Sequence, residues 1–248
     1  MSMSFKTYLS ENNYSNIKTR LELHSKLNDK LWIGKILRSD VAEALQKITK
    51  EFIEFLGIPE NTVLDIILTG SNCSLNYTSM SDIDVHLVID ETKVCDHCDG
   101  DFITDCFKAK KDLWNSEHDI TVKGYPVELY AQSKKDHLVA SGIYSLKKEK
   151  WLKYPSEIGK TRIDDTPVKL KAGEIMDKID SAISDKITNM DTLLAIKTKI
   201  KKMRQSGLEE NSEYSVENLT FKVLRNNGYF DKLDNYMKKL EDANLSLN

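Results

Sequence analysis

The stretch from residue 64 to residue 90, LDIILTGSNCSLNYTSMSDIDVHLVID, constrains the fold most, because it predicts two buried strands that flank a short polar loop. Residues 64–68 form an isoleucine-rich apolar run that a glycine–serine pair ends. Ten residues further on, polar and apolar side chains alternate through residues 82–88, which is typical of a strand with one buried face. We therefore expect two strands of one sheet, joined by a polar loop.

Two aspartates of the second strand fall on one face of the expected sheet. Because successive side chains of a strand point to opposite faces, Asp82 and Asp84 share a face with His86. Two neighbouring carboxylates repel each other, and Mg²⁺, which proteins hold by one or two carboxylates plus substrate phosphates, relieves that repulsion. Gly70 and Ser71 can bring backbone amides and a hydroxyl to a phosphate. The combination predicts metal-assisted phosphoryl or nucleotidyl transfer.

Three elements of this chain resemble the signature of the polymerase-beta-type nucleotidyltransferase superfamily. They are the Gly70-Ser71 pair, the Asp82 and Asp84 pair after ten intervening residues, and Glu128 in the motif YPVELY. The resemblance implies that Asp82, Asp84 and Glu128 hold Mg²⁺ or Mn²⁺, and that Glu128 accepts the proton of an incoming hydroxyl. It also implies that Gly70 and Ser71 hold the terminal phosphates of an NTP such as ATP.

The resemblance extends over residues 60–132 and implies transfer of an NMP from the NTP to an acceptor hydroxyl, with release of pyrophosphate. Ser81, just before the acidic pair, either binds phosphate or closes the loop. A fainter similarity, in residues 128–130, 142–145 and 217–229, is to uncharacterised nucleotidyltransferase-like proteins of large tailed phages.

Three further side chains near the acidic pair have structural interpretations that we favour over functional ones. His86 could tune a metal site, but a histidine at such a strand position is more often a satisfied polar group. Tyr130 and Tyr144 could stack on a base, yet aromatic residues of half-buried strands mostly belong to a core.

The apolar periodicity predicts an α+β fold. Residues 1–155 are expected to form N-terminal helices and a nucleotidyltransferase-like lobe with a small mixed or antiparallel sheet, and residues 166–248 an all-helical bundle. A broken helix is expected within residues 14–33, and a helix over residues 41–56 with Asp40 as its N-cap. A further helix is expected over residues 102–118, with Phe102, Cys106 and Leu113 inward, and hairpins over residues 119–131 and 142–154. The bundle is expected to contain four helices, and Gly207 is expected to end the second of them.

The charge of the chain is unevenly distributed. The net charge of −3 combines 14 Lys+Arg against 21 Asp+Glu in residues 1–130, 17 against 10 in residues 131–204, and 5 against 8 in residues 205–248. The basic region indicates either solvated helix faces, which we favour, or contact with a nucleotide or nucleic acid. Four of its lysines are expected near the rim of a catalytic cleft: Lys147, Lys148, Lys150 and Lys153. The small total charge favours a small molecule or a protein as acceptor over RNA.

The four cysteines predict reduced thiols, since no secretory signal is recognisable, and therefore a cytoplasmic, intracellular location. No apolar run has the length of a membrane span, so no membrane partner is expected. Cys95 and Cys98 form a single CxxC pair in a polar loop, which is a weak zinc signal, and an exposed loop with free thiols is the favoured interpretation.

Two alternatives to an active enzyme remain open from the sequence. The first is a catalytically inactive lobe that binds a nucleotide or a protein partner. The second is a structural or interaction protein in a phage-like context. The three carboxylates argue for the enzyme, but they do not prove turnover.

Overall fold

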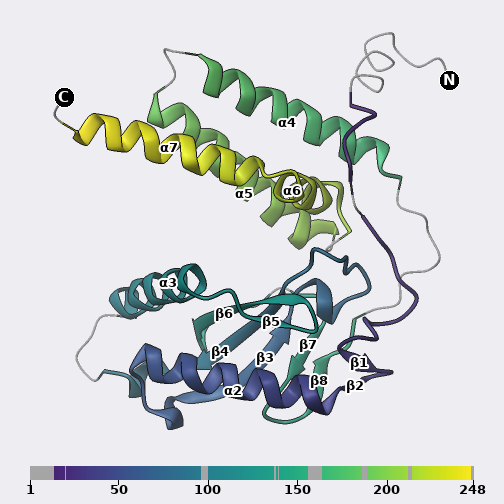
Figure 1. Ribbon diagram of the computed structural model, residues 1–248, viewed down its shortest axis with the longest axis vertical. Helices are drawn as coiled ribbons and strands as arrows, with labels where there is room; N and C mark the ends of the chain where they lie inside the picture. Colours follow the sequence, from purple (N-terminus) through teal and green to yellow (C-terminus); the bar gives the residue numbers. More distant parts are fainter. Residues whose placement is uncertain are drawn as a thin grey trace. The chain divides into compact units, whose positions relative to one another are not determined.

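The computed structural model describes residues 14–19, 21–95, 100–136, 138, 140–155, 164–185, 189–211 and 214–246. The chain forms two compact units (Figure 1). Glu22–Lys160 make up the first, which we call the sheet unit. Met1–Leu21 and Thr161–Asn248 make up the second, which we call the helical unit. The chain therefore passes between the two units twice, after residue 21 and after residue 160, because the segment before residue 22 groups with the C-terminal helices.

The sheet unit is built on a six-stranded mixed sheet in the order β5-β6-β4-β3-β7-β8 (Figure 1). The pair β4–β6 is parallel and the other neighbours are antiparallel. The strands are β3 (Val63–Thr69), β4 (Ile83–Ile89), β5 (Thr121–Val122), β6 (Tyr125–Ser133), β7 (Ile143–Ser145) and β8 (Lys150–Lys153). These strands confirm the expected central strands and both expected hairpins, and the fold is α+β with a mixed sheet.

One face of this sheet is packed into the core of the unit. The alternating residues Ile83, Val85 and Leu87 of β4 are buried there. Helix α2 (Ser39–Leu56) supplies the facing apolar stripe, and α3 (Gly100–Glu117) packs beside it on β6. Gly57 ends α2 in the left-handed conformation, with a φ of 71°, as its position in the sequence predicts. The polar residues of β4 therefore lie on the opposite face.

The segment before α2 is not helical, so the prediction of a helix within residues 14–33 is wrong for its described residues. Residues 22–38, which we call the strap, pack against the core of the sheet unit and contain the short hairpin β1 (Trp32–Ile33) and β2 (Ile36–Leu37). Leu27 and Leu31 of the strap are nevertheless buried and belong to the core of the sheet unit. Asp40 is also not the N-cap of α2. The helix begins at Ser39, and Asp40 pairs with Lys123 instead.

Helix α3 buries a different stripe from the one predicted. Ile103, Phe107 and Trp114 face the core, whereas Phe102 is 62% and Leu113 47% exposed. Trp114 packs against two phenylalanines of α2, Phe52 and Phe55. The largest aromatic side chain therefore sets the rotation of the helix.

The helical unit contains α4 (Thr166–Ser184), α5 (Met190–Asn211), α6 (Val216–Asn226) and α7 (Tyr229–Leu245). In the described part of residues 164–246, the regular elements are all helices, as the sequence predicts. Tyr14 packs so closely on Gly173 of α4 that a Cβ there would lie 2.3 Å from its ring. Gly207 does not end α5, which continues to Asn211. It allows close approach to the start of α6, since a Cβ at Gly207 would lie 2.5 Å from Cβ of Glu217.

Candidate metal centre and phosphate-binding turn

The parallel ladder between β4 and β6 brings two carboxylates of the expected site together. Asp84 lies directly opposite Glu128 in the register, and Asp82 precedes the first residue of β4. One carboxylate oxygen from each of Asp82, Asp84 and Glu128 lies within 4.8 Å of the others, and all three side chains are half-buried. The three acidic residues singled out in the sequence therefore form one cluster on the polar face of the sheet.

The chemistry of this cluster suits a divalent cation. Three carboxylates at this separation repel one another, and partial burial reduces the screening by water. Mg²⁺ and Mn²⁺ prefer oxygen ligands, so the donor set fits either ion. These residues could hold such an ion between the two strands.

The turn after β3 reaches the cluster because residue 70 is glycine. Its φ of 75° and ψ of −165° fall in a region that only glycine adopts readily. A Cβ at this position would lie 1.7 Å from Oδ2 of Asp84 and 2.8 Å from its Cγ. Gly70 thus allows the backbone of the turn to approach the carboxylate, which is the close approach that a phosphate-binding turn beside a metal needs.

The two serines of the expected phosphate site contact each other. Ser71 lies in the short helix η2 (Ser71–Cys73), and its hydroxyl donates to the Ser81 hydroxyl over 2.9 Å. The Ser81 oxygen also accepts the backbone N–H of Thr78, over 2.9 Å. Both serines are buried. Ser81 was expected either to bind phosphate or to close the loop, and these two hydrogen bonds are of the kind that closes the loop.

Tyr130 supports the third carboxylate, a role beyond the core position and the base stacking that its sequence context suggested. Its hydroxyl donates to the Glu128 carboxylate two residues away on the same strand face. Burial, and then the negative charges of Asp84 and Glu128, raise the pKa of Tyr130 above its ordinary value, so the phenol stays protonated and keeps donating. The alternation of Glu128 and Tyr130 along β6 is the sequence signal for this pair.

His86 stacks on Tyr130 and is uncharged at neutral pH. The ring centroids are 4.5 Å apart with an interplanar angle of 13°, and Nδ1 of His86 lies 2.6 Å from Oε1 of Gln132. Burial lowers the pKa of His86 to about 4, and the nearby Lys111 acts in the same direction. The favoured interpretation of His86 as a satisfied polar group on its strand agrees with these contacts.

The loop between the turn and Asp82 is held by two buried asparagines that the sequence analysis did not single out. The Asn72 side chain donates to the backbone oxygen of Asp82 over 2.8 Å, and it accepts from Nδ2 of Asn28 over 2.8 Å. Trp32 donates from Nε1 to the backbone oxygen of Asn72 over 2.9 Å. Asn28 and Trp32 lie in the strap about 40 residues earlier, and nothing local in the sequence connects them to the site.

The tyrosine and lysines of the β7–β8 hairpin are engaged within the sheet unit. Tyr144 lies in the core against Trp32, with ring centroids 5.1 Å apart, so it faces away from the carboxylates. Lys147 donates to the backbone oxygen of Val63 over 2.5 Å, and Lys148 pairs with Asp65 at 2.7 Å. These contacts fix the hairpin to β3.

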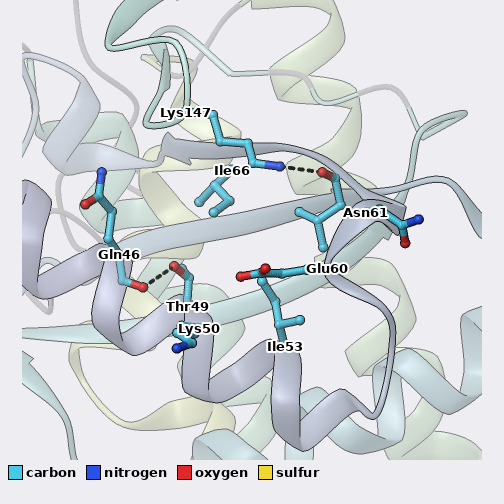
Figure 2. A pocket seen from close by; sticks show the side chains of 9 residues that line it. Gln46, Thr49, Lys50, Ile53, Glu60, Asn61, Ile66 and Lys147 are labelled. Carbon is cyan, nitrogen blue, oxygen red and sulfur yellow. Dashed lines mark hydrogen bonds between the residues drawn. The ribbon is translucent and has the colours of Figure 1, made fainter.

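A separate pocket of about 610 Å³ lies on the core face of the sheet (Figure 2). It opens between α2, the start of β3 and Lys147. Because Ile66 pairs with Leu87 in the register, it lies on the opposite face from Asp84. The floor residues Ile53 and Ile66 are only 6% and 8% exposed, so they offer a ligand little apolar surface. This pocket is not part of the carboxylate site.

The cysteine loop differs in part from the expectation of reduced thiols. Cys73 and Cys106 are free, but Cys95 is disulfide-bonded, and its partner lies outside the described residues. Cys98, the other cysteine of the CxxC pair, lies outside the described residues.

Within the described residues, no helix has both the length and the apolar character that crossing a membrane requires. Comparison of the chain with protein-family models, with curated proteins and with solved structures yields no match.

Proposed function

We propose that the sheet unit is a nucleotidyltransferase-like lobe that moves an NMP from an NTP to an acceptor hydroxyl and releases pyrophosphate. One observation carries the proposal: Asp82, Asp84 and Glu128 converge to within 4.8 Å beside a turn that only glycine allows so close. A carboxylate cluster and a phosphate-accessible backbone are the two parts that metal-dependent phosphoryl chemistry requires.

Each carboxylate has a role in this proposal. Asp82, Asp84 and Glu128 would hold Mg²⁺ or Mn²⁺. A divalent cation bound there would stabilise the charge that develops on the α-phosphate. The oxygen of the acceptor attacks the α-phosphorus, the bond to pyrophosphate breaks, and the acceptor proton passes to Glu128. Tyr130 fixes the Glu128 side chain through its hydrogen bond.

The donor phosphates would lie at the turn formed by Gly70 and Ser71. The missing side chain of Gly70 lets the backbone of the turn lie close to Asp84, and the Ser71 hydroxyl can exchange its partner Ser81 for a phosphate oxygen. Such an exchange retains one hydrogen bond for the serine, so its cost is small.

We infer a small molecule or a protein side chain as acceptor in preference to RNA. The net charge is −3, whereas RNA-binding domains carry a clear basic excess. Lys147 and Lys148 donate to groups of β3, and Lys153 donates to the backbone oxygen of Ala140. Three of the four lysines considered for an RNA surface are therefore already engaged.

The test is pyrophosphate release from each NTP in the presence of Mg²⁺ and fractionated cell extract. We expect release with at least one NTP and its loss in the variants Asp82→Ala and Glu128→Gln. Removal of a general base typically costs about 10²–10⁴-fold in rate. Glu51→Gln, on the exposed side of α2, is the matched control and should retain full activity.

Pyrophosphate release combined with a measurement of NTP binding separates an enzyme from a nucleotide-binding module. Calorimetry of NTP binding with and without Mg²⁺ should show metal-dependent binding that the Asp82→Ala, Asp84→Ala double variant loses. Binding without pyrophosphate release in any fraction would identify an inactive lobe. Equal binding by wild type and double variant would refute the site itself.

A further inference from the structure

The three carboxylates are not held in place in the same way. Asp84 belongs to two ladders, because it pairs with Thr69 of β3 and with Glu128 of β6. Glu128 is fixed by the same ladder and by Tyr130. Asp82 lies one residue before β4 and takes part in neither ladder. The two ladders therefore position Asp84 and Glu128, whereas Asp82 lies at the end of the loop that leads into β4.

Asn72 links the glycine turn to the backbone of the residue that carries this third carboxylate. Its Nδ2 donates to the backbone oxygen of Asp82 over 2.8 Å. The neighbouring contact between Ser71 and Ser81 spans the same ten-residue loop. Two parallel links thus join the glycine turn to the residues that lead into β4.

The orientation of Asn72 is in turn set by the strap. Asn72 is 1% exposed, and an amide side chain that is buried to this extent needs partners for both its donor and its acceptor. Nδ2 of Asn28 satisfies the acceptor, and Asn28 is itself 2% exposed. A flipped Asn72 amide would present two donors to each other at this contact and two acceptors at Asp82, so Asn28 selects the orientation that holds Asp82.

We propose that Asn28 is a positioning residue for the carboxylate site, acting through Asn72 on the backbone of Asp82. The strap is then a component of the metal centre as well as part of the core. This inference rests on the proposed function, and it adds two residues that neither touch the metal nor carry charge. Groups that orient metal ligands typically contribute 10- to 100-fold to metal affinity or activity.

The experiment measures Mn²⁺ affinity by electron paramagnetic resonance together with the thermal unfolding midpoint. Asn28→Ser is the selective variant. Serine is too short to reach Asn72, but its hydroxyl can still accept the backbone N–H of Lys30, as Oδ1 of Asn28 does over 3.1 Å. We expect Mn²⁺ affinity to fall by roughly 10-fold in Asn28→Ser and in Asn72→Ala.

Two controls distinguish positioning from general stability. Thr49→Val removes another buried hydrogen bond, from the threonine hydroxyl to the backbone oxygen of Gln46, on the opposite face of the sheet. It should lower the unfolding midpoint without changing Mn²⁺ affinity. The double variant Asn28→Ser, Asn72→Ala should bind Mn²⁺ no more weakly than Asn72→Ala alone, because both residues act along one path.

The outcomes separate this inference from the proposed function. Wild-type protein that fails to bind Mn²⁺ would overturn both. Wild-type binding that Asn28→Ser retains in full would overturn the role of Asn28 alone, and so would additive losses in the double variant. Circular dichroism checks that each single variant folds. If Asn72→Ala does not fold, the Mn²⁺ affinity of Asn28→Ser alone tests the role of Asn28.

Discussion

Replacement of Gly70 by alanine tests the geometry of the candidate site directly. The added methyl group has two separate consequences, a strained backbone and a clash with the Asp84 side chain. The backbone has a φ of 75° and a ψ of −165°, a conformation that costs a residue with a Cβ about 1–3 kcal/mol. The new Cβ would also lie 1.7 Å from Oδ2 and 3.3 Å from Cβ of Asp84, so the carboxylate must rotate away.

These two consequences appear in different measurements. All three tryptophans lie in the sheet unit, so urea unfolding followed by tryptophan fluorescence reports its stability. We expect a loss of about 1–3 kcal/mol in unfolding free energy from the backbone conformation. We also expect Mn²⁺ affinity to fall at least about tenfold, because one of the three carboxylates has left the cluster.

Gly124→Ala is the matched control. Gly124 has a φ of 83°, but a Cβ at this position would meet nothing within 4 Å. It should show the conformational loss in stability, about 1–2 kcal/mol for a left-handed residue, and an unchanged affinity for Mn²⁺. The reasoning fails if Gly70→Ala binds Mn²⁺ as wild type does, or if both glycine variants lose affinity equally.

Three further predictions concern the surroundings of the site. Tyr130→Phe removes the hydrogen bond to Glu128, and pyrophosphate release should fall roughly 10- to 100-fold while the unfolding midpoint changes little; an unchanged rate would show that Glu128 needs no such support. The Lys134 ammonium and the Thr92 hydroxyl lower the pKa of Asp90 to about 2, so the stability that this carboxylate contributes is present above pH 4 and is lost as the pH falls toward 2. The Asp90→Asn variant should therefore lose less stability than wild type between pH 4 and pH 2, and identical acid-unfolding curves would contradict this reasoning. RNA should bind weakly, with an affinity that depends little on salt concentration. A plot of log affinity against log salt concentration with a slope of roughly −0.7 per phosphate contact would instead indicate an RNA acceptor, provided that alanine at Lys150 and Lys153 abolishes the slope.

The central strands and the placement of Asp82 and Asp84 on one face could be predicted from the sequence because both depend on local alternation, whereas Glu128 was added to them only by the family resemblance. Strand periodicity places Asp84 and His86 on one face and Val85 on the other, whatever the neighbouring strands are. The register then brings Asp84 opposite Glu128. The glycine at residue 70 is also a local signal, since only glycine adopts its backbone conformation without strain.

The remaining features were decided by contacts between distant parts of the chain. The leucines of the strap have near-helical spacing, yet the segment forms turns and a short hairpin, because its buried leucines pack into the core of the sheet unit. Helix α3 is rotated so that Trp114 reaches Phe52 and Phe55, which outweighs the burial of Phe102.

The support of Asp82 shows the same division most clearly. The sequence alone determined that an acidic pair follows a glycine turn, since both lie in one stretch of the chain. Only the tertiary structure decided that Asn28, more than 40 residues before Asn72, completes the hydrogen bonding of that stretch. The physical reason is that a buried amide must be satisfied by whichever group the fold brings next to it, and sequence distance does not enter that requirement.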